Sequence, residues 1–282
     1  MSIAPPLHLD PSNAPTSSDV YGSHDATLAL AAPSCVLPAS LAENIRHLHG
    51  RIPETALCLF ETASCLAYTE NDLPRNASSL DMTFHAHLPL DLPWSGHDPS
   101  QNAAVTTAAL ALDVLDRVAS LSPRCAVLHP PDGPTEGRRL LLAAFARHWH
   151  QRSSVPLLLE NTRHCDVLEL GEDFRFGEGF GLCLDIAHLM GYGQWGLLVS
   201  RLPESAGIVH WSAPGVRDDH RPLAALTPPQ REVASALIRR VPPTATHLLE
   251  IFDWDAVAAS IPYLQELARR QPPSVEGKEH RC

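Results

Sequence analysis

Histidine and carboxylate side chains recur along this chain at spacings that suit a metal site. Two short pairs, Asp185-x-x-His188 and Asp218-x-His220, can each hold one divalent ion or bridge two. Imidazole and carboxylate groups are ligands of Zn²⁺, Mn²⁺ and Fe²⁺, and the chain has no Cys-x-x-Cys pair to offer thiolates instead. A metal cluster lowers the pKa of bound water to roughly 7 and so supplies hydroxide at neutral pH. These residue types therefore predict metal-dependent hydrolysis.

Most of the candidate ligands stand at the ends of short, almost continuously apolar runs. Such runs are typical of parallel strands covered on both faces. If the strands close into a barrel, their carboxyl ends meet at one rim, where barrel active sites are built. The polar residues at or just after these ends are Glu61, His85, His87, His129, Glu160, Asp185, His188, His210, Asp218, Asp219, His220 and Glu250. Because burying acidic groups without partners is costly, one shared metal cluster explains them together.

Single members of this set also have simpler explanations. A lone histidine at a strand end is more often a hydrogen-bonded structural residue than a ligand. Glu61 could be half of a salt bridge, and Asp219 a solvated neighbour of Asp218. Of His85 and His87 we expect only one to face the barrel interior. The other histidines are expected to be surface or core residues: His47, His49, His148, His150, His164 and His247.

Eight apolar runs predict strands, and helical patterns separate most of them. The predicted strands are residues 34–37, 56–60, 82–87, 125–129, 157–160, 181–185, 207–210 and 248–252. The predicted helices are residues 41–49, 102–121, 135–151, 194–202, 228–240 and 253–270. About eight strand–helix units favour an α/β fold of the (β/α)₈ TIM-barrel type. The alternative, an open doubly wound sheet, usually has a glycine-rich phosphate loop after its first strand, and none is present.

A chain of 282 residues suits one such domain, and no linker divides it. We expect a disordered N-terminal tail over residues 1–30, the catalytic barrel over residues 31–271 and a C-terminal tail over residues 272–282. The first tail is rich in Pro, Ser, Asp and Ala and lacks the regions of a signal peptide. Seven scattered cysteines, an odd number, predict a reduced, cytoplasmic protein.

The charge balance argues against a polyanionic partner. The net charge is −11, from 21 basic and 32 acidic residues, and it would repel a phosphate backbone. We therefore expect no nucleic acid partner, and no run of eighteen apolar residues indicates a membrane span. The oligomeric state has no signal in the sequence. Four arginines of predicted rim loops could contact a phosphate, although we expect most of them to be solvated: Arg163, Arg175, Arg217 and Arg221.

The ligand pattern resembles that of the xylose isomerase-like barrels, a superfamily that includes the apurinic endonucleases. The order of the residues and the Asp-x-x-His and Asp-x-His spacings match, and His87-Leu-Pro89 resembles the first histidine motif, which favours His87 over His85. The resemblance implies two or three divalent ions, zinc first, with manganese or iron as alternatives. We also expect Glu160 and Glu250 to be catalytic. The implied metal ligands are His87, His129, Glu160, Asp185, His188, His210, Asp218, His220 and Glu250.

Longer segments are most similar to the cobamide-remodelling phosphodiesterase (CbiR) family. Examples are Leu157-Leu-Leu-Glu-Asn-Thr162 and Cys183-Leu-Asp-Ile-Ala-His-Leu189, and the likeness runs from about Cys35 to Leu267. It implies hydrolysis of the nucleotide-loop phosphodiester of a cobamide, which releases cobinamide phosphate and the lower-ligand riboside. The implied substrate is therefore a small-molecule corrinoid.

Other activities stay open at this point. A sugar (phosphate) isomerase or epimerase would use Glu160 and Glu250 as an acid/base pair around one ion and leave His129, His188 and the Asp-x-His pair without a role. An apurinic endonuclease-like DNA repair hydrolase suits the ligand set, but the negative charge suits a duplex poorly. A non-catalytic metal-binding module fits less well, because one closed structural site uses only four ligands.

Overall fold

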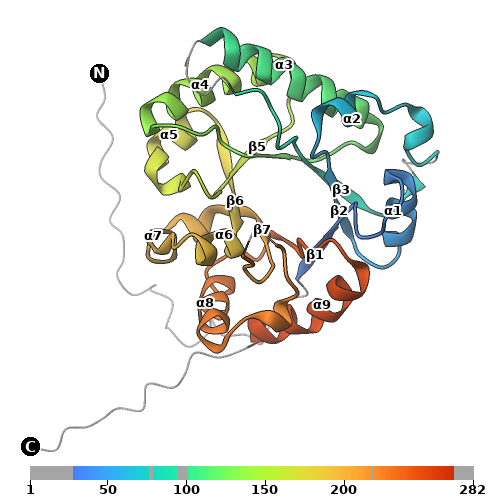
Figure 1. Cartoon of the computed structure of the whole chain (residues 1–282), viewed down its shortest axis with the longest axis vertical. Helices are drawn as coiled ribbons and strands as arrows, with labels where there is room; N and C mark the ends of the chain where they lie inside the picture. The colour runs from blue at the N-terminus through green and yellow to red at the C-terminus, as the bar shows by residue number, and fades with distance from the viewer. Residues whose placement is uncertain (1–27, 76–78, 95–100, 217–218, 270–282) are drawn as a thin grey trace, which may run out of the picture.

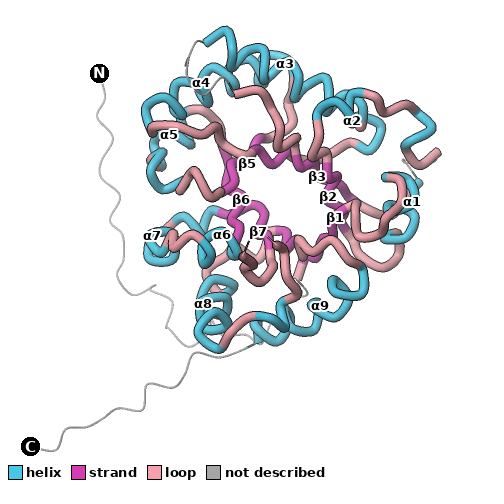
Figure 2. Tube along the Cα trace, viewed as in Figure 1, coloured by secondary structure: helices cyan, strands magenta, loops and turns pink. Residues whose placement is uncertain are grey.

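The computed structural model describes residues 28–75, 79–94, 101–216 and 219–269, which form a closed barrel of parallel strands. Each strand pairs with the next along the chain, and β8 pairs with β1 to close the ring. Helices surround the ring (Figure 1), and Figure 2 shows the strands as its inner wall. The predicted (β/α)₈ barrel is therefore confirmed. Within the described residues, no helix is long and apolar enough to cross a membrane.

The strands are short and their ends define the two rims. Their bounds are β1 Ala29–Pro33, β2 Glu54–Cys58, β3 Thr83–His87, β4 Ala126–Leu128, β5 Leu157–Glu160, β6 Phe180–Asp185, β7 Ala206–His210 and β8 Thr246–Leu248. The α-helices are α1 Leu41–Leu48, α2 Thr62–Leu66, α3 Gln101–Arg117, α4 Thr135–Arg152, α5 Glu172–Gly177, α6 Ile186–Gly191, α7 Trp195–Val199, α8 Pro228–Ile238 and α9 Trp254–Arg269. Short 3₁₀ helices are η2 Glu70–Asp72, η4 Ala119–Leu121, η5 Val167–Leu170, η6 Leu202–Ser205 and η7 Leu223–Ala225.

The longer helices follow the sequence closely because their ends carry local signals. Ser40 and Glu43 form a capping box at the start of α1, with each side chain bonded to the other residue's backbone. Thr227 and Gln230 do the same at α8, where Pro228 takes the first helical position. The helices α2, α5 and α6 have only five or six residues, too few to show a helical period, and they were not predicted.

Two predicted strands were placed wrongly. The first strand is β1, Ala29–Pro33, rather than residues 34–37, so residues 29 and 30 belong to the barrel and not to the expected tail. Its alanines look weak as a strand sequence, yet Ala31 belongs to the crowded middle layer of the barrel, where a small side chain fits. The last strand is β8, Thr246–Leu248, rather than residues 248–252, because the polar Thr246 is paired and hydrogen-bonded inside the barrel. The rest of the predicted tails, residues 1–27 and 272–282, lies outside the described residues.

The barrel interior is apolar in the middle and polar toward both ends. Below the middle layer, the Glu54 carboxylate accepts hydrogen bonds from His85, Arg124 and Thr246. A larger apolar core lies between the strands and the surrounding helices. The middle layer itself consists of Ala31, Ala56, Cys125, Val127, Leu158, Cys183, Ile208 and Leu248. The upper polar end, at the carboxyl ends of the strands, contains the candidate site.

Candidate metal centre

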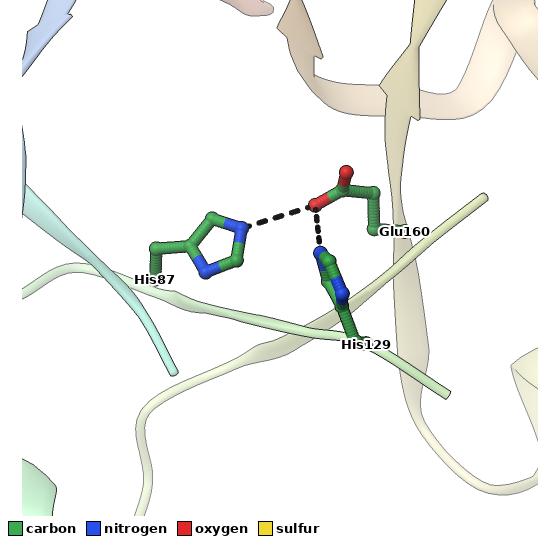
Figure 3. Close-up of side chains that lie close together, drawn as sticks. All are labelled: His87, His129 and Glu160. Atoms are coloured by element: carbon green, nitrogen blue, oxygen red, sulfur yellow. Dashed lines mark hydrogen bonds and ion pairs between the residues drawn. The ribbon is translucent and has the colours of Figure 1, made fainter. Parts of the chain in front are cut away.

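The carboxylate of Glu160, the last residue of β5, lies at the centre of the upper rim. Its Oε2 atom is 3.2 Å from His87 Nε2 and 3.3 Å from His129 Nε2. His87 ends β3 and His129 directly follows β4, and Figure 3 shows both rings directed at this carboxylate. One ligand atom from each residue lies within 4.8 Å of the other two. The three side chains can therefore hold one ion between them.

A second group of ligands shares Glu160 and comes from β6, β7 and the segment after β8. The Nδ1 atom of His210 is 3.0 Å from Glu250 Oε2 and 3.5 Å from Glu160 Oε2. Asp185 Oδ2 lies 3.9 Å from the same ring nitrogen. Ligand atoms of all four residues lie within 4.8 Å of one another. Glu160 belongs to both groups and would contribute to holding an ion in each.

His188 and His220 extend the cluster outward from these two groups. His188 Nδ1 lies 3.3 Å from Glu160 Oε1, and the centroids of the His188 and His220 rings are 6.1 Å apart. His220 Nδ1 lies 3.5 Å from Glu250 Oε2. The predicted partner of His220, Asp218, lies outside the described residues. His188 and His220 therefore lie together at the outer edge of the cluster.

Two residues that the sequence analysis did not single out hold the β5 and β6 ligands in place. The side chain of Asn161 accepts a hydrogen bond from the Asp185 N–H at 2.7 Å and donates one to the Asp185 carbonyl at 2.9 Å. It also donates to Gln194 Oε1 at 2.9 Å. Asp185 in turn caps α6, since its Oδ1 accepts the backbone N–H of His188. The signal that could have indicated Asn161 is its place directly after Glu160, at the carboxyl end of an apolar strand.

The two glutamates are held in their ionised forms. Burial raises the pKa of Glu160, but the nearby His129 and His210 rings outweigh burial and hold that pKa well below its usual range. Burial likewise raises the pKa of Glu250, and His210 with His220 outweighs it and lowers the pKa far below normal. Both carboxylates are therefore charged at neutral pH, which is the form that binds a metal.

Asp185 and His210 hold protons more strongly than usual in the metal-free arrangement. Burial raises the pKa of Asp185 to about 6, and the Glu250 and Glu160 charges add to this effect while His188 opposes it. Burial lowers the pKa of His210, but Cys183 and the two glutamates outweigh burial and raise that pKa well above its usual value. The cluster thus has an excess of negative charge, which bound protons partly neutralise.

The buried polar atoms of this cluster fit a set of divalent cations. Glu160, Asp185, His210 and Glu250 are at most 4% exposed. Among the described residues, well-aligned hydrogen bonds are lacking for Glu160 Oε1, Asp185 Oδ2, Glu250 Oε2 and both ring nitrogens of His210. Leaving such atoms unsatisfied is costly, and one ion can satisfy several at once. Imidazole and carboxylate donors suit Zn²⁺, Mn²⁺ or Fe²⁺.

No protein-family model and no curated protein matches this chain. Solved structures match it along the barrel. Endonuclease IV from Thermus thermophilus superposes with a TM-score of 0.62 and 18% identity, covering 84% of this chain and 98% of that chain. A xylose isomerase domain protein from Alicyclobacillus acidocaldarius subsp. acidocaldarius gives a TM-score of 0.58 and 14% identity, covering 86% and 99%. The chain has the xylose isomerase-like barrel fold.

A third structure with this fold was obtained with zinc. The TTHB071 protein from Thermus thermophilus, soaked with ZnCl₂, gives a TM-score of 0.59 and 24% identity, covering 86% of this chain and 97% of that chain. Structural neighbours of the chain therefore include a protein studied with zinc. Whether the rim of this chain binds zinc depends on its own side chains.

The xylose isomerase-like barrel brings the described candidate ligands to one rim. They are His87, His129, Glu160, Asp185, His188, His210, His220 and Glu250. Two other rim residues remain apart from this group. Glu61 is exposed at the start of α2, where its carboxylate contacts Ser64, and Asp219 is exposed on the loop after β7.

The prediction that only one of His85 and His87 faces the interior was wrong. Residues two apart on a strand share a face, and the β2–β3 register sets these histidines beside Ala56 and Cys58. Both are buried. His85 points inward but lies one layer lower, where its Nδ1 is 2.6 Å from Glu54. It is therefore separate from the metal centre.

A cavity of about 800 Å³ opens beside the cluster, with His129 and His188 in its wall. Leu90 and Trp94 from the loop after β3, and Tyr192 after α6, add apolar and aromatic surface. Loop side chains of this kind lie outside any strand or helix period, so the sequence did not indicate them. The metal centre is thus one edge of a much larger space.

The four arginines proposed as phosphate contacts have different positions. Arg163 is exposed and lines the cavity. Arg175 lies in α5 and is only 1% exposed, so it is a buried helix residue rather than part of a rim loop. Arg221 is exposed, with its backbone bridged to Ala213, and Arg217 lies outside the described residues. Arg163 is therefore the best placed of the described three.

Proposed function

We propose that this protein is a metal-dependent phosphodiesterase that hydrolyses the nucleotide-loop phosphodiester of cobamides. The products are cobinamide phosphate and the riboside of the lower ligand, and the substrate is a small-molecule corrinoid. The observation that carries the hydrolase part is the single connected ligand cluster around Glu160. The corrinoid part is supported by the similar segments along the chain, such as those at Glu160 and Asp185.

The number of ligands favours phosphodiester hydrolysis over sugar isomerisation. One ion between Glu160 and Glu250 would suffice for an isomerase or epimerase. His129, His188 and His220 join the same cluster, with carboxylate contacts of 3.3, 3.3 and 3.5 Å, and a single ion would leave them idle. Two or more ions suit a phosphodiester, because together they can stabilise both the attacking and the leaving oxygen.

The space beside the cluster favours a large substrate. Small-molecule sites usually measure about 300–1,000 Å³, and the cavity of about 800 Å³ stands near the upper end. A sugar fills only a fraction of that volume. Arg163 in the wall can bind a phosphate or an amide oxygen by charge-assisted hydrogen bonds. A corrinoid, with a broad macrocycle and polar amides, suits such a space.

DNA repair is disfavoured by charge. A duplex carries a dense line of phosphates, and proteins that bind it usually concentrate lysine and arginine on one face. This chain has 21 basic and 32 acidic residues. The net negative charge of the protein repels a polyanion at long range, before any contact forms.

The side chains have separate tasks in the proposed reaction. A bound cluster of divalent ions supplies Lewis acidity toward a phosphate and an activated water. Glu160 and Glu250 supply permanent negative charge to hold that cluster, because their pKa values are far below neutral. Asp185, with a pKa of about 6, gives up its proton readily when a cation approaches. Arg163 orients the substrate in the cavity.

The proposal is tested by incubating zinc-loaded protein with a complete cobamide and separating the products by chromatography. We expect cobinamide phosphate and the riboside, and no product with Glu160→Ala. The matched control is Glu136→Ala on the exposed surface of α4, which should react like the unchanged protein. Failure of the metal-loaded protein to cleave any cobamide, together with epimerisation of a ketose, would overturn the proposal in favour of the isomerase alternative.

A further inference from the structure

An exposed aromatic ring stands beside the metal centre and is not part of the cavity wall. Phe252, two residues after Glu250, is 40% exposed. Its ring centroid lies 5.0 Å from the His220 ring and 5.8 Å from the Phe60 ring, with interplanar angles of 73° and 80°. A ligand that covers this apolar ring removes it from water, which favours binding.

Phe60 connects this ring to the opposite end of the cluster. It follows β2, is half-buried, and its centroid lies 5.2 Å from the His87 ring. The two phenylalanines therefore form a continuous aromatic step that contacts a candidate ligand at each end, His87 and His220. We call Phe60 and Phe252 the aromatic step.

The aromatic step and the cavity wall come from different stretches of the rim, which meet where the Leu90 N–H donates a hydrogen bond to the Phe60 carbonyl at 3.0 Å. Phe60 follows β2 and Phe252 follows β8, and both strands neighbour β1. The cavity wall comes instead from loops after β3, β4, β5, β6 and β7. A phosphodiester held at the metals would direct one substituent toward the aromatic step and the other toward the cavity. The aromatic step is the smaller of these two surfaces.

We infer that Phe252, supported by Phe60, stacks against the planar heteroaromatic base on the nucleoside side of the scissile phosphodiester. The inference rests on the proposed function and assigns its two halves: the base lies on the aromatic step and the larger corrinoid part extends into the cavity. Stacking requires only a flat π-face, so it tolerates different bases. The step thus binds the lower ligand without reading its edge.

Other exposed apolar residues of the described chain do not meet both requirements. Leu90 and Val216 are exposed at the cavity but have no aromatic face. Phe176 and Trp195 are exposed aromatics, but they lie on the outer helices α5 and α7, away from the rings of the cluster. Tyr192 also contacts a candidate ligand, with its ring centroid 5.5 Å from that of His188, but it belongs to the cavity wall. Phe252 combines an exposed apolar ring and contact to His220 with a position outside that wall.

The test uses Phe252→Leu and Phe252→Trp in the full, zinc-loaded chain. Leucine keeps apolar bulk against His220 but removes the π-face, whereas tryptophan enlarges that face. Binding is measured by calorimetric titration with a benzimidazole riboside, and with ribose phosphate as a probe that lacks the base. Phe176→Leu is the matched control, because it makes the same change at an exposed site remote from the rim.

We expect Phe252→Leu to bind the riboside roughly 5- to 100-fold more weakly, since stacking on one aromatic side chain has that effect. Ribose phosphate affinity, zinc content and kcat should stay unchanged, KM for a cobamide should rise in parallel, and Phe252→Trp should restore riboside binding. Equal riboside affinity in Phe252→Leu and the unchanged protein would overturn the inference. If the riboside result holds but no cobamide is cleaved, the stacking surface stands and the proposed function fails.

Discussion

The backbone carbonyl of Asn161 accepts a hydrogen bond from Nδ1 of His188 at 2.8 Å. A carbonyl oxygen can only accept, so this ring carries its hydrogen on Nδ1 and has its lone pair on Nε2, the ring nitrogen that can bind a metal. The side chain of the same asparagine fixes the backbone of Asp185 on both its N–H and its carbonyl. One residue therefore orients both members of the Asp185–His188 pair.

Replacing Asn161 by alanine should weaken metal binding while the barrel stays folded. Partners that orient metal ligands typically change metal affinity by about 10- to 100-fold. The affinity is measured by competition with a coloured chelator. Asn44→Ala is the matched control, because Asn44 is equally buried but hydrogen-bonds the loop at Leu37 and Ala39. Asn44→Ala should lower stability without changing metal affinity, and the same affinity in both variants would rule out a positioning role for Asn161.

Removal of metal should destabilise the protein. Glu160, Asp185 and Glu250 are buried close together, and without cations their negative charges oppose one another. A ligand present at 100 times its Kd stabilises a fold by about 2.7 kcal/mol, so the melting temperature should rise by roughly 5–10 °C when zinc is returned after chelation. Magnesium should have a smaller effect because it prefers an all-oxygen shell. An unchanged melting temperature with zinc would contradict the fit of these residues to metal.

Stability at acid pH should depend on Glu54 at the lower end of the barrel. Burial raises the pKa of Glu54, but hydrogen bonds and charge from His85 and Arg124 lower it overall from 4.5 to about 2. A depressed pKa contributes stability above pH 4.5 that is lost as pH falls from 4.5 toward 2. The difference corresponds to about 3 kcal/mol, at about 1.36 kcal/mol per pKa unit.

Urea unfolding at several pH values checks this contribution. Glu54→Gln should be less stable than the unchanged chain at pH 7, and the gap should shrink as the pH falls below 4.5. Glu204→Gln, at an exposed surface pair with Arg240, serves as the control and should show little difference at any pH. A difference in the free energy of unfolding between Glu54→Gln and the unchanged chain that stays constant down to about pH 3 would contradict this account. It would mean that His85 and Arg124 do not stabilise the ionised form of Glu54.

Arg163 should affect substrate binding more than turnover. It is exposed and lines the cavity rather than the metal cluster. Loss of one charge-assisted hydrogen bond at an exposed site should raise KM for the phosphodiester by about tenfold and leave kcat within about twofold. Steady-state kinetics of Arg163→Ala are compared with Arg147→Ala on the exposed face of α4. Identical KM values for the two variants would remove Arg163 from the substrate site.

The sequence predicted best where a local pattern and the barrel geometry agree. The strand at residues 157–160 has its predicted bounds, and its last residue, Glu160, is at the centre of the rim. The convergence of His87, His129, Glu160 and His210 follows from one rule, that parallel strands of a barrel end at the same rim. This convergence could be predicted without knowledge of any contact between these residues.

The parts that were missed depend on partners distant in the sequence. His85 is fixed by Glu54, 31 residues away, and Thr246 by the same carboxylate, 192 residues away. The cavity depends on loop conformations that have no period, and Phe252 was placed within a strand although β8 ends before it. Tertiary contacts, rather than local propensity, decide these features.

The most direct test of the metal centre is a crystal soaked with zinc and measured at the zinc absorption edge. We expect two or three anomalous peaks at the upper rim, one between His87, His129 and Glu160 and one between Glu160, Asp185, His210 and Glu250, each about 2.0–2.2 Å from its ligand atoms. Side chains in the same places with no anomalous peak among them would contradict the account.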